Sequence, residues 1–128
     1  MSKEAIEKIC NDLSLPKGDA FMQDWIYELP EEHRTFDSFK KYFEAYVFNS
    51  YELDEKKLLF NLMMDVTNDM LEMDEEKGDL SWLALSYILA RDKGQFTEEL
   101  DYWANEDEPI DSSFAITSRV RSFILQSE

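Results

Sequence analysis

Several residue types that support particular folds and chemistries are scarce in this 128-residue chain. Its single cysteine, Cys10, excludes an internal disulfide and a cysteine-rich zinc site. Three glycines and three prolines are too few for the many turns of a β-rich fold. There is one histidine, His33, and no apolar run of about 18 residues that would span a membrane. These absences favour a helical protein with few routes to metal or nucleophilic chemistry.

Basic residues are also scarce, and the shortage is uneven along the chain. Lys and Arg total 13 against 29 Asp and Glu, which gives a formal net charge of −16. Residues 54–113 hold 17 acids and 5 bases, whereas residues 1–53 carry a net charge of −5 and residues 114–128 carry +1. Such a charge repels nucleic acid and anionic membranes, and it attracts a basic protein at long range.

The composition is nevertheless that of a folded protein. Hydrophobic residues make up 44% of the chain and aromatic residues 14%, whereas disordered acidic tails are poor in aromatics. The N-terminal segment lacks the apolar stretch of a signal peptide. We therefore expect one domain over residues 1–128 in a soluble, cytoplasmic protein.

Apolar residues recur at the three- and four-residue spacing of amphipathic helices along nearly the whole chain. In the first half we expect three helices, with Ser2, Asp19 and Thr35 as N-caps. A fourth and longest helix begins near Asp54 and is expected to stop at Gly78. Its buried stripe comprises Leu58, Leu59, Leu62, Met63, Val66 and Met70. Its polar side comprises Asn61, Asp65, Asp69, Glu72 and Glu76.

A fifth helix is expected over residues 80–93 and is apolar nearly all round. A helix without a polar face belongs in the centre of a bundle, so its large side chains should be largely inaccessible. The residues concerned are Trp82, Leu83, Leu85, Ile88 and Leu89. Thr97 should cap a short sixth helix, and Asp111 should cap a last helix after the charged connector 105–109. The fold class is all-α: a single compact bundle of six to seven helices with a central apolar helix near 80–93.

No motif for catalysis or metal binding accompanies the carboxylates. An EF-hand loop read around Gly78 has Met73 in place of the first Asp and Ala84 in place of the final Glu. A di-iron bundle needs Glu three residues before His, and Pro30 precedes His33 at that spacing. We expect no metal, no cofactor and no enzymatic activity. The pairing of 29 acids in space is not visible in a sequence, so a carboxylate-pair hydrolase stays open.

The candidate binding residues are the carboxylates of the most acidic segment, with one aromatic anchor among them. Unmatched like charges on helices cost free energy, so their retention indicates a use, whereas the alternative is a solubilising surface. Trp103 lies on a short helix between two acidic clusters, either as a hot spot for a basic protein or as a packed lid of the bundle. The predicted partner-binding residues are Asp69, Glu72, Glu75, Glu76, Glu98, Glu99, Asp101, Trp103, Glu106, Asp107 and Glu108.

In size and charge the whole chain resembles bacterial immunity proteins, which occupy nuclease toxins, and DNA-mimic inhibitors. The resemblance implies an acidic protein-binding module that neutralises a basic partner, most simply a toxin domain. Charge complementarity would also speed association, toward ~10⁸ M⁻¹s⁻¹ at low salt. The alternative is a non-inhibitory helical adaptor whose groove binds an amphipathic peptide. We expect neither nucleic acid nor membrane as a partner.

Overall fold

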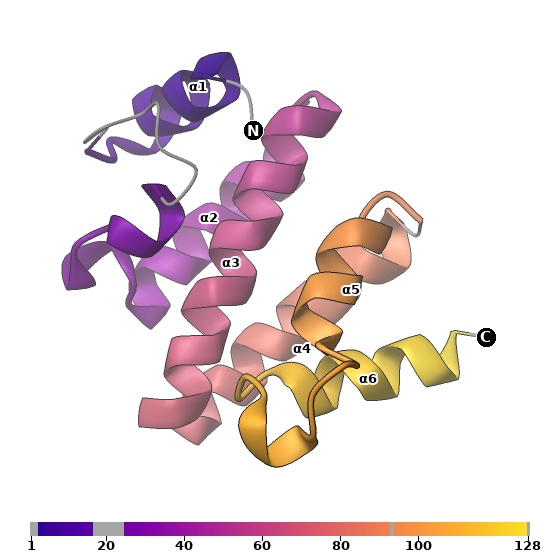
Figure 1. Ribbon diagram of the computed structural model, residues 1–128. Coiled ribbons are helices and arrows are strands. Elements are labelled where there is room, and N and C mark those ends of the chain that lie inside the picture. Colours follow the sequence, from indigo (N-terminus) through magenta and orange to yellow (C-terminus); the bar gives the residue numbers. More distant parts are fainter. Residues whose placement is uncertain (1–2, 17–24, 93, 128) are drawn as a thin grey trace. The chain divides into compact units, whose positions relative to one another are not determined.

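The computed structural model describes residues 3–16, 25–92 and 94–127. Within them the chain is all-helical and has no strand, as the sequence predicts (Figure 1). The α-helices are α1 (Lys3–Leu13), α2 (Phe36–Phe48), α3 (Leu53–Met73), α4 (Glu75–Arg91), α5 (Thr97–Ala104) and α6 (Thr117–Gln126). The 3₁₀ helices are η1 (Trp25–Glu28), η2 (Glu31–His33) and η3 (Ile110–Ser112). None of the described helices has the length and apolar character needed to cross a membrane.

The contacts between residues divide the chain into two compact units. Unit 1 comprises Met1–Val66 and unit 2 comprises Thr67–Glu128, so the boundary falls inside α3. Unit 1 carries 14 acids and 8 bases, and unit 2 carries 15 acids and 5 bases, which gives net charges of −6 and −10. The expectation of one domain over residues 1–128 stays a prediction.

In unit 1, α1 packs against α2 through apolar faces that the sequence marks clearly. α1 buries Ile6, Ile9 and Cys10, which share one side of a helix because they are spaced by three and four residues. Thr35 caps α2 as predicted, since its side-chain Oγ1 accepts a 3.1 Å hydrogen bond from the backbone N–H of Ser38. The predicted caps Ser2 and Asp19 lie outside the described residues.

α3 is the helix with the most buried side chains among the six. Its whole predicted stripe is buried, and the neighbouring Phe60 and Met64 are buried as well. One member of its predicted polar side departs from expectation, because Asp65 is only 6% exposed. An ion pair between Asp65 and Arg34 compensates the loss of water around this carboxylate.

The turn between α3 and α4 lies earlier than the sequence predicts. α3 ends at Met73, and Asp74 caps α4 by accepting a hydrogen bond from the backbone N–H of Lys77. Gly78 is therefore inside α4 and does not stop a helix. A Cβ atom on Gly78 would lie 2.9 Å from the Leu71 Cα atom, so glycine allows these two helices to approach closely.

α4 is buried on only one side, so part of the burial that the sequence predicts for it is wrong. Leu85, Ile88 and Leu89 are buried as expected, but Leu83 is 65% exposed and Trp82 is only half-buried. In the structure only one side of this helix packs against the core. Three of its large apolar side chains lie on the other side and face solvent. The exposed side chains are Leu80, Leu83 and Tyr87.

The last part of unit 2 is built from α5 and α6, which pack together, with η3 in the loop between them (Figure 1). Asp111 does not cap the last helix, because it lies in η3 and α6 begins at Thr117. The Asn68 side chain of α3 accepts a 2.9 Å hydrogen bond from the backbone N–H of Ile116 at the start of α6. Phe96, without a side-chain cap bond, precedes α5 in place of the predicted Thr97.

Candidate functional site

The predicted carboxylates all belong to unit 2 and fall into two groups. The corner group lies on both sides of the turn from α3 to α4 and comprises Asp69 and Glu72 of α3 with Glu75 and Glu76 of α4. The loop group lies on α5 and on the connector after it, and comprises Glu98, Glu99, Asp101, Glu106, Asp107 and Glu108. Asp69 and Glu99 are half-buried, and the other eight are exposed.

Part of the corner group is explained by helix stability alone. Glu75 and Glu76 occupy the first turn of α4, where the helix dipole favours negative charge by a few tenths of a kcal/mol or more. The capping residue Asp74 also pairs with Lys77, at 3.8 Å between Oδ2 and Nζ. At least two carboxylates of the corner group, Glu75 and Glu76, therefore stabilise α4 without any partner.

The loop group is held in place by Arg121 of α6. Its guanidinium donates hydrogen bonds to three backbone carbonyl oxygens, at 2.7 Å to Ala104, 2.7 Å to Asn105 and 2.9 Å to Glu108. Asn105 ends α5 in the left-handed conformation, with φ 47°, and its side chain reaches Ser113 Oγ at 3.3 Å. Arg121 thus binds backbone oxygens of this segment and no carboxylate among those contacts. The side chains of residues 106–108 are exposed on a loop whose backbone is held by these bonds.

Of the two interpretations of Trp103, its burial favours the packed tryptophan over the exposed anchor, because it is only 2% exposed. The ring packs edge-on against Tyr102 and Phe114, at centroid distances of 5.1 and 5.0 Å. Thr117 Oγ1 donates a 2.8 Å hydrogen bond to the Trp103 carbonyl oxygen. The alternative interpretation, a tryptophan packed into the bundle, is therefore correct. The neighbouring Tyr102 is 51% exposed and is the aromatic side chain at the surface of the loop group.

The basic residues of unit 2 mostly serve the fold. Lys77 pairs with Asp74, Arg119 pairs with Asp79, and Arg121 binds backbone carbonyls. Arg91 is exposed at the end of α4. Across residues 67–92 and 94–127, the five exposed members of the loop group form no ion pair with a basic side chain.

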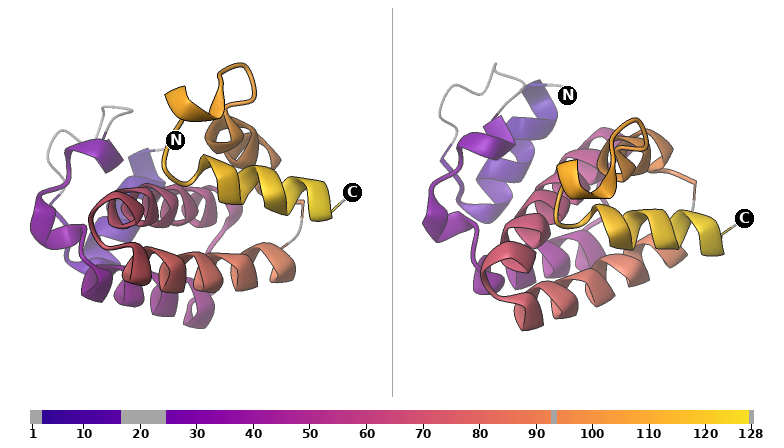
Figure 2. Two further views of the ribbon diagram at one scale, coloured as in Figure 1. Left: turned by 90° about the horizontal axis from the view of Figure 1, so that it is seen from below. Right: turned by 60° about the horizontal axis from the view of Figure 1, so that its bottom comes forward.

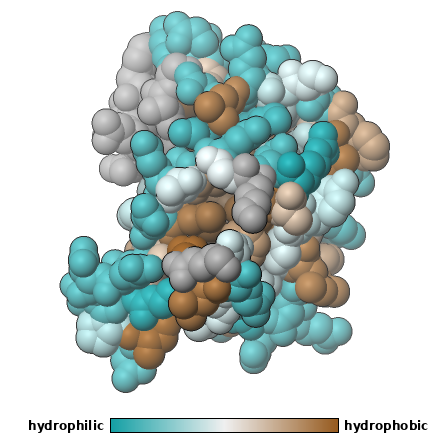
Figure 3. Space-filling model, turned by 90° about the vertical axis from the view of Figure 1, so that its right-hand side faces the viewer, coloured by the Kyte–Doolittle hydropathy of each residue, from teal (hydrophilic) through white to brown (hydrophobic). Residues whose placement is uncertain are grey.

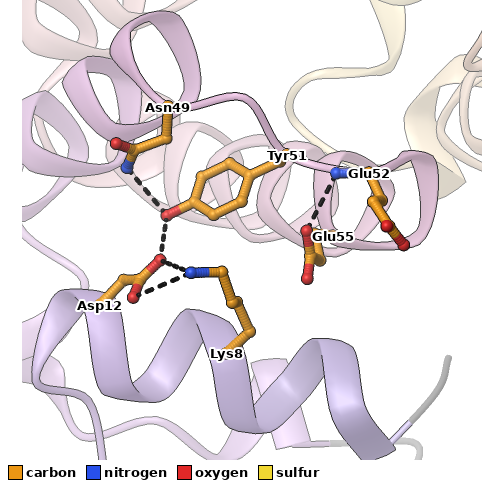
Figure 4. A network of polar contacts seen from close by, with 6 residues as sticks. All are labelled: Lys8, Asp12, Asn49, Tyr51, Glu52 and Glu55. Carbon is orange, nitrogen blue, oxygen red and sulfur yellow. Dashed lines mark hydrogen bonds and ion pairs between the residues drawn. The ribbon is translucent and has the colours of Figure 1, made fainter.

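A polar cluster in unit 1 was not predicted from the sequence (Figure 4). Tyr51 donates a 2.8 Å hydrogen bond to Asp12, and Lys8 pairs with the same carboxylate at 3.1 Å. The bond from Tyr51 lowers the pKa of Asp12, while burial raises the pKa of Tyr51 to about 12. Asn49 completes the cluster beside an open hollow of about 420 Å³. The bond from Tyr51 to Asp12 ties α1 to the segment before α3, and Glu52 and Glu55 lie in the same network.

A second hollow, of about 650 Å³, lies between α4 and α6 in unit 2, which Figure 2 shows as neighbouring helices. Trp82 and Phe123 form its apolar part, and Arg119 is its charged residue. The remaining lining residues are Ser86, Ser118, Ser122 and Gln126. Hydrophobic side chains also reach the surface among hydrophilic ones on the face drawn in Figure 3. The hollow could not be predicted from the sequence, because the residues of its two walls lie about 36 positions apart along the chain.

Residues suited to metal or nucleophilic chemistry lie apart from these groups. Within the described ranges no three His, Cys, Asp or Glu side chains are placed to hold a metal ion. His33 lies in η2, with Nε2 3.6 Å from Glu32 Oε1. Cys10 is buried in α1, as expected of a small apolar side chain. Comparison with protein-family models, with curated proteins and with solved structures found no match.

Proposed function

We propose that this chain is a non-catalytic binding module that uses the loop group to capture a basic protein in the cytoplasm. The observation that carries the proposal is the use of charge in unit 2. Its basic side chains mostly contact the fold, whereas the five exposed carboxylates form no ion pair with a basic side chain among the described residues. Together with the net charge of −10 for the unit, this leaves a strong negative field over α5 and its loop.

The conformation of the loop suits rapid and specific binding. Three hydrogen bonds from Arg121 fix the backbone that carries Glu106, Asp107 and Glu108, so less conformational entropy is lost when a partner arrives. Exposed charges at an interface act mainly on the association rate. Tyr102, half-exposed beside them, supplies the amphipathic aromatic contact that is typical of binding hot spots.

The most specific form of the proposal is an immunity-type inhibitor of a nuclease toxin. The active cleft of a nuclease is basic because it binds phosphate, and carboxylates spaced along a fixed loop can occupy such a cleft. A DNA-mimic inhibitor of a nucleic-acid-binding protein uses the same physical principle. Both forms share one requirement, which is a basic surface on the partner.

A non-inhibitory adaptor is the second candidate, and the hollow between α4 and α6 favours it. Trp82 and Phe123 give this hollow an apolar floor that could hold one side chain of an amphipathic peptide. Arg119 at the same hollow is paired with Asp79, so apolar contact and not charge would select this peptide. The two candidates therefore differ in how strongly salt should weaken binding.

The test is a capture experiment with matched variants. The chain is immobilised, exposed to lysate of its source cell at about 50 mM and 500 mM salt, and the retained proteins are identified by mass spectrometry. One variant converts five carboxylates of the loop group to amides: Glu98, Asp101, Glu106, Asp107 and Glu108. A control variant of equal net charge converts five exposed glutamates of unit 1 to glutamine: Glu4, Glu31, Glu32, Glu44 and Glu52.

We expect the native chain and the control variant to retain the same basic protein at low salt, and the loop variant to lose it. The retained protein is then added to a nuclease assay, where inhibition by the native chain distinguishes an inhibitor from an adaptor. Equal retention by both variants, or capture of an acidic protein alone, would contradict binding through the loop group.

A further inference from the structure

The solvent-facing side of α4 carries an apolar stripe with a charge of opposite sign at each end. Leu80, Leu83 and Tyr87 are 49%, 65% and 53% exposed, and Glu76 and Arg91 are also exposed. Successive residues of an α-helix are turned by about 100°, which places these five side chains within about 80° of one another around the axis. They therefore form one continuous row along the helix.

This row differs from an ordinary solvent-facing helix side. Single exposed apolar residues are common, but several on successive turns of one helix mark a surface that binds another protein. The opposite side of α4 already packs into unit 2 through Leu85, Ile88 and Leu89. The exposed row is thus a second apolar side of the same helix, and about half or more of each of its three apolar residues is accessible to solvent.

The spacing along the row is symmetric about its own centre. The midpoint between residues 76 and 91 and the midpoint between residues 80 and 87 coincide, between residues 83 and 84. An identical helix placed antiparallel on this centre would set Glu76 opposite Arg91, Leu80 opposite Tyr87, and Leu83 near its own copy. A two-fold axis makes both ends alike, as isologous interfaces require.

We propose that the exposed side of α4 binds a second copy of this chain, antiparallel and about a two-fold axis beside Leu83. The paired charges fix the register, and a crossing angle near 20° keeps two helices in contact over the roughly 22 Å that separate Glu76 from Arg91. Three half-exposed apolar side chains per copy give a small interface, and each chain carries a net charge of −16. The dimer is accordingly weak and forms at high protein concentration.

The first test measures the mass of the purified chain by sedimentation equilibrium from about 5 to 500 μM at about 150 mM salt, where charge repulsion is screened over about 8 Å. We expect the 15.2 kDa chain to approach twice its mass at the upper end. Leu83→Gln should raise the dissociation constant at least about tenfold, because it places an amide on the two-fold axis. The matched control Leu125→Gln changes an equally exposed leucine of α6 and should leave association unchanged.

The second test examines the register by exchanging charges. Glu76→Arg and Arg91→Glu should each weaken association by about three- to tenfold, because each sets like charges opposite each other. The double variant should return to within about threefold of the native chain. Glu98→Arg and Lys41→Glu make the same changes of net charge elsewhere and report the effect of overall repulsion alone.

Three outcomes would overturn the proposal. The first is a chain that stays monomeric at every concentration, which would assign the apolar stripe to a different protein. The second is a dimer that Leu83→Gln does not weaken, which would place the interface elsewhere. The third is a double charge exchange that fails to recover association, which would exclude the antiparallel register. Circular dichroism of each variant establishes that its helices are intact.

Discussion

The two units of this chain are both acidic, yet they use their charges differently. In unit 1, charged side chains join segments that are far apart in sequence, as in the pair Arg34–Asp65 and the bond from Tyr51 to Asp12. In unit 2, Arg119 likewise joins α6 to Asp79 of α4, but Arg121 binds backbone oxygens and all carboxylates of the loop group except Glu99 are exposed. The location of the basic side chains, and not the net charge alone, is therefore the basis on which we propose a binding surface.

The physical basis of the difference is burial. The side chains of Arg34 and Asp65 are 12% and 9% exposed, so each needs the other to offset the loss of hydration. The carboxylates of residues 106–108 keep their water and need no partner for stability. Replacing a buried carboxylate such as Asp65 should therefore affect folding, whereas replacing the exposed carboxylates of residues 106–108 should affect binding.

The largest effect should come from breaking the buried pair in unit 1. Asp65→Asn leaves the Arg34 charge without its carboxylate, and we expect a loss of about 3–5 kcal/mol in the free energy of unfolding. Urea denaturation measures this loss. The control Asp37→Asn removes an exposed partner of Lys40, 3.3 Å away, and should change stability by less than about 0.5 kcal/mol. Equal effects of the two variants would show that burial does not separate these pairs.

The next effect concerns the two sides of α4. Leu85→Ala removes a fully buried side chain and should cost about 2–5 kcal/mol, whereas Leu83→Ala on the exposed side should change stability by less than about 0.5 kcal/mol. The same denaturation experiment, at concentrations where the chain is monomeric, gives both values. A larger loss for Leu83→Ala would mean that this side of the helix belongs to the core.

Arg121 is the basic residue of unit 2 with the largest structural role. Arg121→Gln removes its three hydrogen bonds to carbonyl oxygens and should lower the free energy of unfolding by about 1.5–3 kcal/mol. Hydrogen exchange of the amides of residues 105–109 should become faster. Arg91→Gln should leave both quantities unchanged in dilute solution. If hydrogen exchange at residues 105–109 is the same in Arg121→Gln as in the native chain, Arg121 does not restrict the motion of the loop.

Alkaline titration should affect unit 1 through its buried tyrosines. Burial raises the pKa of Tyr51 and of Tyr42 to about 12, while an unfolded tyrosine titrates near 10. A raised pKa contributes stability below pH 10 that is lost as the pH increases toward 12, because the unfolded chain releases its proton first. Urea midpoints from pH 8 to 11 should fall less steeply in Tyr51→Phe. An identical slope would contradict a buried phenol.

Removal of metal ions by a chelator should have no effect on stability. The exposed carboxylates of unit 2 are expected to hold no structural cation, so EDTA should change neither the melting temperature nor the helical circular dichroism signal. A reproducible fall of several degrees would indicate a carboxylate site, with Asp69 and Glu72 the first residues to replace. It would also assign part of the acidic surface to folding.

Local sequence patterns predicted much of the helical framework. Thr35 caps α2, and the apolar stripe of α3 is buried, because a cap bond and a helical period depend on residues within a few positions of each other. The end of α3 was harder to predict from the sequence. A glycine such as Gly78 commonly ends a helix, but here it lies inside α4 and allows close approach to Leu71, and such packing is not visible along the chain.

Side-chain direction was the part that the sequence could not provide. Tyr102 and Trp103 are adjacent and both contact Phe114, yet Trp103 is buried and Tyr102 is 51% exposed, which the local sequence does not indicate. α4 is apolar on all sides, so its period does not indicate which side faces the core. Asp65 became buried because Arg34, 31 residues earlier, lies beside it. The sequence located the acidic segment, but it did not indicate which of its carboxylates form no ion pair.

The most direct test of the account is the association rate of the captured basic protein as a function of ionic strength. It is measured by stopped flow for the native chain, for the loop variant with five neutralised carboxylates, and for the matched unit 1 variant. The account predicts that the loop variant loses both rate and salt dependence, while the unit 1 variant behaves like the native chain. If both variants lose rate equally, the surface of unit 2 has no special role and overall charge alone drives association.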